Sequence, residues 1–254
     1  MSATAANGRP SPPTEINETT GCILLHTFYV ENGNLSIEDA RHAFRVLRLK
    51  PGDDVIALSK GARYCARITD ISEKSGAVTL IVELPSNESH AEITVYQGLP
   101  KSEKLELLAQ KLTELGVSRL VPVRMARSVA KLEGASRIER LNKIAREAVK
   151  QCGRTRPMEI CAPMSWNAAL LDMQSRELML APWELSQPVR MADIRKQIPA
   201  AREIGILIGP EGGMEEAEVR ESGAQQVSLG PRILRAETAA LTAAALAMSL
   251  WGDL

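Results

Sequence analysis

The chain has 254 residues, of which 44% are hydrophobic, 24% charged and 3% aromatic, and its formal net charge at pH 7 is zero. This composition excludes a fibrous or wholly disordered chain, and the length predicts one large or two modest domains with aliphatic cores. The four cysteines form no CxxC pair and only three histidines accompany them, which disfavours a metal site and predicts reduced, buried thiols.

The two ends of the chain bear on its location. Residues 1–21 contain three prolines and no apolar core, so we expect a disordered tail and not a secretory signal. The longest apolar stretch, 239–251, spans 13 residues, whereas a membrane helix needs about 20. We therefore expect a cytoplasmic protein without a membrane span.

Residues 22–86 have the pattern of a small β-barrel. A helix is expected at 37–48, with Ser36 as its N-cap and the sequence KPG at 50–52 as its end. Short alternating or β-branched runs surround it, at 22–30, 53–59, 63–71 and 77–84. Residues 84–92 are interpreted as a linker.

Residues 91–254 alternate between strand and helix patterns, which indicates an α/β domain. Strands are expected at 93–99, 119–123, 177–181, 203–209 and 225–230, and helices at 101–116, 137–151 and 214–223 and in the apolar C-terminal stretch. Two of the strands are continuous apolar runs, which is typical of a parallel sheet covered on both faces.

Two glycine-bearing loops leave the last two expected strands, at the sheet edge where parallel sheets bind ligands. They read IGPEGG at 208–213 and LGPRILRAET at 229–238. Glycines there let the backbone turn tightly and approach a ligand. Neither loop is a P-loop or a GxGxxG fingerprint, and Glu215 and Glu216 disfavour a phosphate. On its own, the first loop fits a ligand site and an ordinary tight turn about equally well.

Positive charge is concentrated in one segment. Residues 119–156 contain eleven Lys and Arg against three acidic residues, a local excess of eight that the rest of the chain must balance. Such asymmetry fits a basic face that binds a phosphate backbone, and it fits solvated helix surfaces equally well.

Five segments in order resemble one family. They are HAFRVLRLKPGD at 42–53, KLTELGV at 111–117, QCGRT at 151–155, IGPEGG at 208–213 and LGPRILRAETA at 229–239. Together they resemble the knotted SPOUT superfamily of S-adenosylmethionine-dependent methyltransferases, in the form of the family that methylates N3 of a uridine in bacterial 16S rRNA. The resemblance spans residues 22–254. It departs at Arg41, where the family has a histidine, and around His26 and Thr27.

The resemblance implies a fold and a cofactor site. The expected fold is α/β, with a PUA-like RNA-binding barrel at 22–86 and a trefoil-knotted SPOUT domain at 91–254, usually in a homodimer and without a metal. S-adenosylmethionine is then expected to contact Leu180, Ala181, Pro182, Gly209, Pro210, Glu211, Gly212, Gly213, Ser228, Leu229, Gly230, Ile233, Leu234 and Thr238.

The expected catalytic candidates follow from the chemistry at N3. The imide proton must leave and negative charge must be stabilised. Arg232 and Arg235 are candidates for holding the uracil carbonyls or a phosphate, and Glu237 for contacting the cofactor or the base. Glu237 fits equally well as a partner of the positive end of the last helix. No general base can be identified from the sequence.

The expected partner is 16S rRNA of the small ribosomal subunit, with the target base unpaired or flipped out. Phosphate contacts are expected from Arg48, Arg124, Arg127, Lys131, Lys143, Arg146, Lys150, Arg154 and Arg156. Two alternatives stay open: a SPOUT methyltransferase acting on tRNA or a ribose 2′-hydroxyl, and a non-catalytic RNA-binding or ribosome-assembly protein with the same fold.

Overall fold

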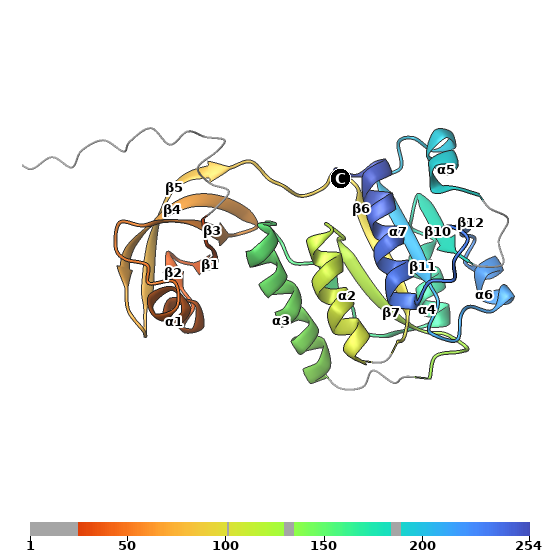
Figure 1. Cartoon of the computed structure of the whole chain (residues 1–254), viewed down its shortest axis with the longest axis horizontal. Helices are drawn as coiled ribbons and strands as arrows, with labels where there is room; N and C mark the ends of the chain where they lie inside the picture. The colour runs from red at the N-terminus through yellow and green to blue at the C-terminus, as the bar shows by residue number, and fades with distance from the viewer. Residues whose placement is uncertain (1–24, 101, 130–134, 184–188) are drawn as a thin grey trace, which may run out of the picture. The chain divides into compact units, whose positions relative to one another are not determined.

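The computed structural model describes residues 25–100, 102–129, 135–183 and 189–254. The expected N-terminal tail and the beginning of the first expected strand lie outside these ranges. The chain divides at Leu84 into two compact units (Figure 1). The segment 85–91, at the start of the second unit, forms neither helix nor strand.

The first unit is the small barrel that the sequence predicts. It closes in the order β1-β2-β5-β4-β3, so every strand has a neighbour on both sides. Its strands are β1 (Thr27–Glu31), β2 (Asn34–Leu35), β3 (Asp54–Ser59), β4 (Ala62–Ile71) and β5 (Gly76–Leu84). Alternate side chains such as Phe28, Val55 and Ile68 fill the interior.

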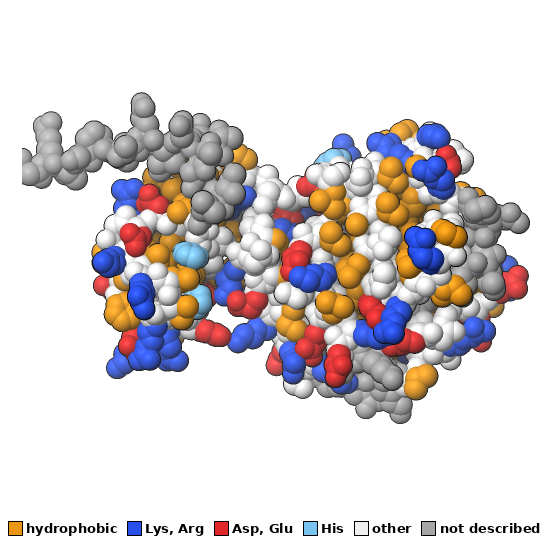
Figure 2. Space-filling view, viewed as in Figure 1, with side chains coloured by type: hydrophobic (Ala, Val, Ile, Leu, Met, Phe, Trp, Pro, Cys, Tyr) orange, Lys and Arg blue, Asp and Glu red, His pale blue; other side chains and the backbone are white. Residues whose placement is uncertain are grey.

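The barrel carries one helix, α1 (Ile37–Arg45), which begins as expected. The Ser36 side chain accepts a hydrogen bond of 3.0 Å from the Asp39 amide, which satisfies one of the unpaired donors of the first turn. The helix ends at Arg45, three residues before the expected end, and Arg48 in the turn that follows adopts a left-handed conformation with φ 55°. In Figure 2, Lys and Arg side chains gather on the part of the unit that carries α1.

The second unit is built on a parallel sheet in the order β12-β10-β11-β6-β7-β8, with the short strand β9 also paired to β7. The strands are β6 (Glu92–Gly98), β7 (Arg119–Arg124), β8 (Glu159–Ile160), β9 (Met164–Ser165), β10 (Leu178–Pro182), β11 (Glu203–Ile208) and β12 (Gln225–Val227). The helices are α2 (Ser102–Glu114), α3 (Ala135–Cys152), α4 (Trp166–Met173), α5 (Met191–Gln197), α6 (Glu216–Glu221) and α7 (Ala236–Trp251).

Helices cover both faces of this sheet, as the apolar runs predict (Figure 1). Strand residues such as Val95 and Leu180 pack with α2, α3, α5 and α7 in one core cluster. Their neighbours Tyr96 and Ala181 point the other way and pack with α4 and α6 in a second cluster. The parallel sheet thus separates two cores and leaves the carboxyl ends of its strands at one edge.

Candidate active site

The first glycine-bearing loop follows β11 and is held by the strand beside it. Gln97 at the end of β6 is buried, and its Nε2 donates to the Gly209 carbonyl at 3.1 Å. The Gly213 amide closes a turn by donating to the Pro210 carbonyl at 2.9 Å, and Gly213 has φ 76°, a conformation that favours glycine. A Cβ at Gly98 would lie 2.5 Å from the Pro210 nitrogen, so the loop backbone rests directly on the end of β6.

The loop after β7 supports the other side of this segment. Arg127 Nη1 donates to the Gly212 carbonyl at 3.2 Å, and its Nε lies 3.7 Å from Glu215. The buried Glu218 accepts from the Ala126 amide and the Glu215 amide, each at 2.8 Å, and so joins this loop to the start of α6. The first loop is therefore fixed by contacts from β6, from the loop after β7 and from α6.

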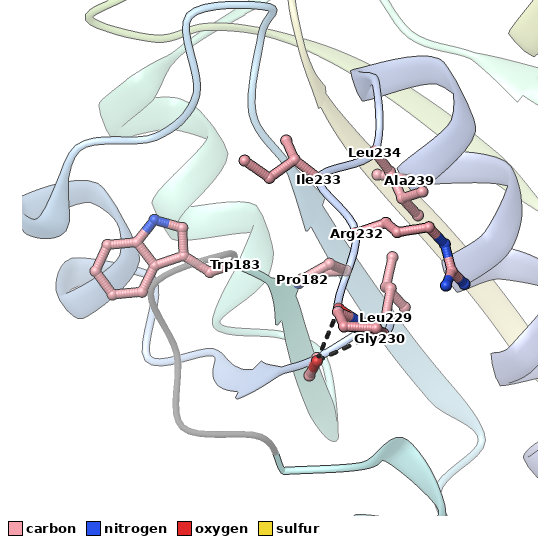
Figure 3. A pocket seen from close by; sticks show the side chains of 10 residues that line it. Pro182, Trp183, Leu229, Gly230, Arg232, Ile233, Leu234 and Ala239 are labelled. Carbon is pink, nitrogen blue, oxygen red and sulfur yellow. Dashed lines mark hydrogen bonds between the residues drawn. The ribbon is translucent and has the colours of Figure 1, made fainter.

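The second glycine-bearing loop follows β12. The Gly230 amide donates to Ser228 Oγ at 3.2 Å, and Gly230 has φ 110° (dashed line in Figure 3). The loop ends at Arg235, the N-cap of α7. Arg232 and Ile233 point to opposite sides of the loop in Figure 3, and Ile233 is 86% exposed.

The two loops meet at one cavity of about 500 Å³, a size within the range of roughly 300–1,000 Å³ for ligand pockets. A smaller hollow of about 200 Å³ between the second loop and the end of β10 shares part of its wall with this cavity. The larger cavity is lined by Lys104, Pro182, Ile208, Gly209, Pro210, Glu211, Gly212, Gly213, Met214, Ile233, Leu234, Arg235, Ala236 and Ala239. Segments far apart in the sequence thus converge on one space.

An ammonium and two carboxylates meet at the cavity wall. Lys104 Nζ on α2 lies 3.2 Å from Glu211 in the first loop and 3.0 Å from Glu237 in α7. The hydrogen bond to Glu237 raises the pKa of Lys104, and Glu211 adds to the effect. Burial opposes ionisation of Glu237, but a backbone amide and Lys104 hold the pKa of Glu237 below its ordinary value. Lys104 and Glu237 are therefore both charged near neutral pH.

Most residues expected to bind the cofactor lie around these two hollows. Those on their walls are Pro182, Gly209, Pro210, Glu211, Gly212, Gly213, Ser228, Leu229, Gly230, Ile233 and Leu234. Leu180 and Ala181 are fully buried, one in each core cluster, and Thr238 is exposed. None of these three residues lines either hollow.

The three catalytic candidates occupy different positions. Arg235 lines the larger cavity and Arg232 the smaller one, and both are exposed. Glu237 stands behind the wall and pairs with Lys104. The sequence indicated Trp183 within the expected pocket segment 180–183, but it did not indicate Lys104, Met214 or Ala239. Only Lys104 carried a signal, as a charged residue in the first turn of a helix that follows a strand.

The residues expected to contact phosphate are spread over both units. Arg48, Arg124, Arg127, Lys143, Arg146 and Arg156 are exposed, and Lys131 lies outside the described residues. Lys150 is only 18% exposed and pairs with Glu147 at 2.7 Å. Arg156 lies 3.5 Å from Glu92, so part of the positive excess is balanced by distant carboxylates.

Arg154 is a correction to the expected RNA contacts. Its side chain is 5% exposed and pairs with Glu88 at 2.7 Å. Its Nη1 donates to the carbonyls of Thr113 and Val117 at 3.0 and 2.8 Å. Glu88 also accepts from the Thr155 amide at 2.8 Å. The Arg154 guanidinium is thus fully occupied inside the unit, where it holds the segment after β5 and cannot reach a phosphate.

Two further observations concern metals and membranes. Across the described ranges, no cluster of three or more His, Cys, Asp or Glu side chains has a geometry suited to a metal ion. In the same part of the chain, every helix is too short or too polar to span a bilayer.

Comparison with known domain families matches both units. Residues 87–248 match a family described as an RNA methyltransferase domain, and residues 36–81 match an RNA methyltransferase PUA domain. With the parallel sheet and the closed barrel, these matches fit the SPOUT fold.

Individual proteins are similar over most of the chain. The ribosomal RNA small subunit methyltransferase E of Bacillus subtilis is 35% identical over 219 residues, which cover 81% of this chain and 85% of that protein. The Neisseria gonorrhoeae protein of the same name, solved bound to S-adenosyl methionine, is 32% identical with a TM-score of 0.77, covering 90% of this chain and 99% of that one. A putative methyltransferase from Legionella pneumophila, also solved with bound cofactor SAM, is 27% identical with a TM-score of 0.78, covering 91% and 100%.

Proposed function

This chain belongs to the family of ribosomal RNA small subunit methyltransferases E, and from that premise we propose that it transfers a methyl group from S-adenosylmethionine to N3 of a uridine in 16S rRNA. The observation that carries the proposal is the convergence of both glycine-bearing loops and the end of β10 on one cavity. The reaction belongs in the cytoplasm, where rRNA is found.

The cavity has the chemistry that this cofactor requires. Ile233, Leu234 and Ala239 supply an apolar wall for the adenine ring. The two loops bring peptide groups to the edge of the same space, so amides and carbonyls can recognise the polar edges of the base and the ribose. Gly213 and Gly230 hold left-handed turns and carry no side chain that would stand between a ligand and the loop backbone.

The charge beside the cavity suits a cationic ligand. When bound, the cofactor supplies an activated methyl group on a positively charged sulfonium. The Glu211 carboxylate on the cavity wall offers that cation a partner of opposite charge. Lys104 also joins α2, the first loop and α7, so it holds these three walls of the pocket at fixed positions relative to one another.

The residues of this chain then act mainly by orientation. The methyl group needs a uracil N3 in line with the sulfur, and correct alignment can contribute up to roughly 7–11 kcal/mol. Arg235 and Arg232 stand at the rims of the two hollows, where a guanidinium can hold the uracil carbonyls as negative charge develops at N3. Glu237 is a positioning residue here, because its lowered pKa makes it a weak proton acceptor.

The RNA is held by exposed cations of both units. Arg48, Arg124, Arg127, Lys143, Arg146 and Arg156 are exposed and serve as phosphate contacts, with Lys150 and Lys131 as further candidates. Arg127 is the most informative of them, because it also touches the Gly212 carbonyl. A phosphate bound by Arg127 would therefore lie next to the first loop.

The active form in this proposal is a homodimer. The second loop exposes Ile233 at 86%, and α7 exposes Leu246 at 40%. Apolar side chains at such positions gain from burial against a second copy. Light scattering coupled to size exclusion tests this directly: twice the chain mass is expected, and a monomer at micromolar concentration contradicts it.

The methylation itself can be tested on rRNA. Small ribosomal subunits from a strain that lacks its own enzyme of this family are incubated with the protein and the cofactor, and the 16S rRNA is reverse transcribed. A new stop at a single uridine is expected, because a methyl on N3 blocks base pairing. A 2′-O-methylated ribose or an absence of any new stop contradicts the proposal.

A further inference from the structure

The segment that follows the barrel, 85–91, is fastened to the second unit by a charged residue at its centre. One oxygen of Glu88 accepts from Nε and Nη2 of Arg154, at 3.1 and 2.7 Å. The other oxygen accepts from the Thr155 amide at 2.8 Å and from the Thr155 hydroxyl at 3.0 Å. The Glu88 and Arg154 side chains are only 12% and 5% exposed, so water competes little for these bonds. We call the pair of Glu88 and Arg154 the clamp.

Neighbouring residues of the segment add contacts on both sides of Glu88. Asn87 Nδ2 donates to the Gly153 carbonyl at 2.8 Å. A Cβ on Gly252, just past the end of α7, would lie 2.9 Å from Ser89 Oγ, so Ser89 rests against that turn. Ala91 is 1% exposed, in the core of the unit. The segment is therefore held from Asn87 onward.

The clamp is bonded to the same elements that carry the cofactor cavity. Arg154 Nη1 donates to the carbonyl of Thr113 in the last turn of α2 and to that of Val117 just after the helix. The first turn of α2 carries Lys104, on the cavity wall. From the clamp the chain runs directly into β6, whose end supports the first glycine-bearing loop (Figure 1). The clamp and the cavity thus belong to one packed body.

The chain that remains between the barrel and the clamp is short and stiff. Strand β5 ends at Leu84, so Pro85 and Ser86 alone separate the last barrel strand from Asn87, the first held residue. Both are exposed. The proline ring fixes φ of Pro85 and disfavours helical backbone at Leu84, which removes much of the freedom of so short a connection. We call Pro85 and Ser86 the tether.

We propose that Glu88 and Arg154 position the RNA substrate by keeping this tether two residues long. The inference rests on the proposed function, in which cations of both units hold one RNA. When two binding surfaces lie on one chain, binding at the first raises the effective concentration of the ligand at the second. That concentration falls roughly as the −3/2 power of the length of the free connection. Because neither residue lines a hollow of the site, both act through the path of the chain, as positioning residues.

Insertions between Pro85 and Ser86 test the tether and leave the clamp unchanged. Eight Gly and Ser residues lengthen the free connection from two residues to ten, so kcat/KM for methylation of small ribosomal subunits should fall about tenfold. Sixteen residues should lower it about twofold further. The matched control places the same eight residues between Lys74 and Ser75, in an exposed turn within the barrel, and should keep kcat/KM within twofold. Cofactor affinity and the thermal midpoint should be unaltered in all three proteins.

Asn87→Ala combined with Glu88→Ala tests the clamp itself. These changes free the chain as far as the buried Ala91, so the connection grows from two residues to six and kcat/KM should fall about fivefold. In this background the eight-residue insertion should lower kcat/KM only about threefold further, in place of tenfold. Rates are measured well below the unfolding midpoint of each protein, and the insertions alone decide the question if the double variant does not fold.

The dependence on length separates this inference from the function on which it rests. A clamp with a purely structural role would change stability, but kcat/KM would not follow the number of inserted residues. If the unchanged protein methylates 16S rRNA and kcat/KM is the same at every tether length, the positioning role is overturned and the methyltransferase stays in place. No methylation by the unchanged protein removes the function, and the role of the tether with it.

Discussion

Gly98→Ala tests the backbone packing that shapes the pocket. The added Cβ would lie 2.5 Å from both the nitrogen and Cδ of Pro210, and 2.8 Å from the Met125 sulfur, whereas ordinary contacts begin at 3.4 Å. Pro210 must therefore move by about 0.9 Å, and it takes the first glycine-bearing loop with it. The ring and backbone of a proline cannot rotate away as the end of a flexible side chain can.

The expected result is a loss of cofactor affinity that exceeds the loss of stability. Overpacking costs about 1–3 kcal/mol in folding free energy. A shift of about 1 Å at a binding loop can cost up to a hundredfold, so we expect S-adenosylmethionine to bind at least tenfold more weakly by isothermal titration calorimetry.

A matched control distinguishes the effect of a crowded core on stability from the effect of a displaced loop on cofactor binding. Gly205→Ala on β11 also crowds the interior, but its Cβ meets chiefly the flexible end of Met179, with the edge of the Tyr96 ring at 3.1 Å. It should lower the unfolding midpoint in denaturant and leave cofactor affinity within twofold. Wild-type affinity in a folded Gly98→Ala protein would refute the assigned position of the pocket.

Three further predictions concern charges and turns. Gly213→Trp should abolish cofactor binding in calorimetry while far-ultraviolet circular dichroism stays unchanged, because φ 76° and the tight turn exclude a large side chain. Lys104→Met should weaken cofactor binding about tenfold, because the first loop and α7 lose the ammonium that joins them, and the effect of Glu237→Gln should then vanish in a double-mutant cycle. Glu88→Gln should destabilise folding by roughly 2–5 kcal/mol at pH 7, because it leaves Arg154 buried without its carboxylate.

The acid side of the stability profile gives a second readout for Glu88. Burial opposes its ionisation, but Arg154 and two backbone amides hold the pKa of Glu88 below its ordinary value. Its contribution is therefore complete above the unfolded pKa of about 4.5 and is lost as the pH falls through the lower folded pKa. Urea titrations from pH 3 to pH 7 should show a shallower acid slope in Glu88→Gln, and an unchanged slope would contradict the assignment.

The sequence was sufficient for the architecture because the main elements bury long, periodic faces. The runs around Val95 and Ile206 predict parallel strands covered on both sides, and Ser36 marks the start of α1 through its capping oxygen. It was not sufficient for β8, β9, α4 and α5. Strands of two residues are too short to show an alternation of apolar and polar residues. Helices as short as α4 and α5 span too few turns to show the apolar repeat of a helix.

The glycines and prolines at the strand ends were sufficient to identify the two loops of the site. They did not show which residues outside the loops line the cavity. Leu180 and Ala181 precede the wall by only one or two residues, yet a strand alternates its side chains into two cores. Arg154 looked like a surface cation because its carboxylate partner, Glu88, lies 66 residues earlier. Charge counted along a segment cannot show partners that folding brings from elsewhere.

A crystal structure determined with S-adenosylmethionine would locate the cofactor on the chain. We expect its density in the cavity between Gly209–Gly213 and the second loop, with the sulfonium on the side of Glu211 and the adenine against Leu234. Density at another place on the chain, or an empty cavity at saturating cofactor, would contradict it.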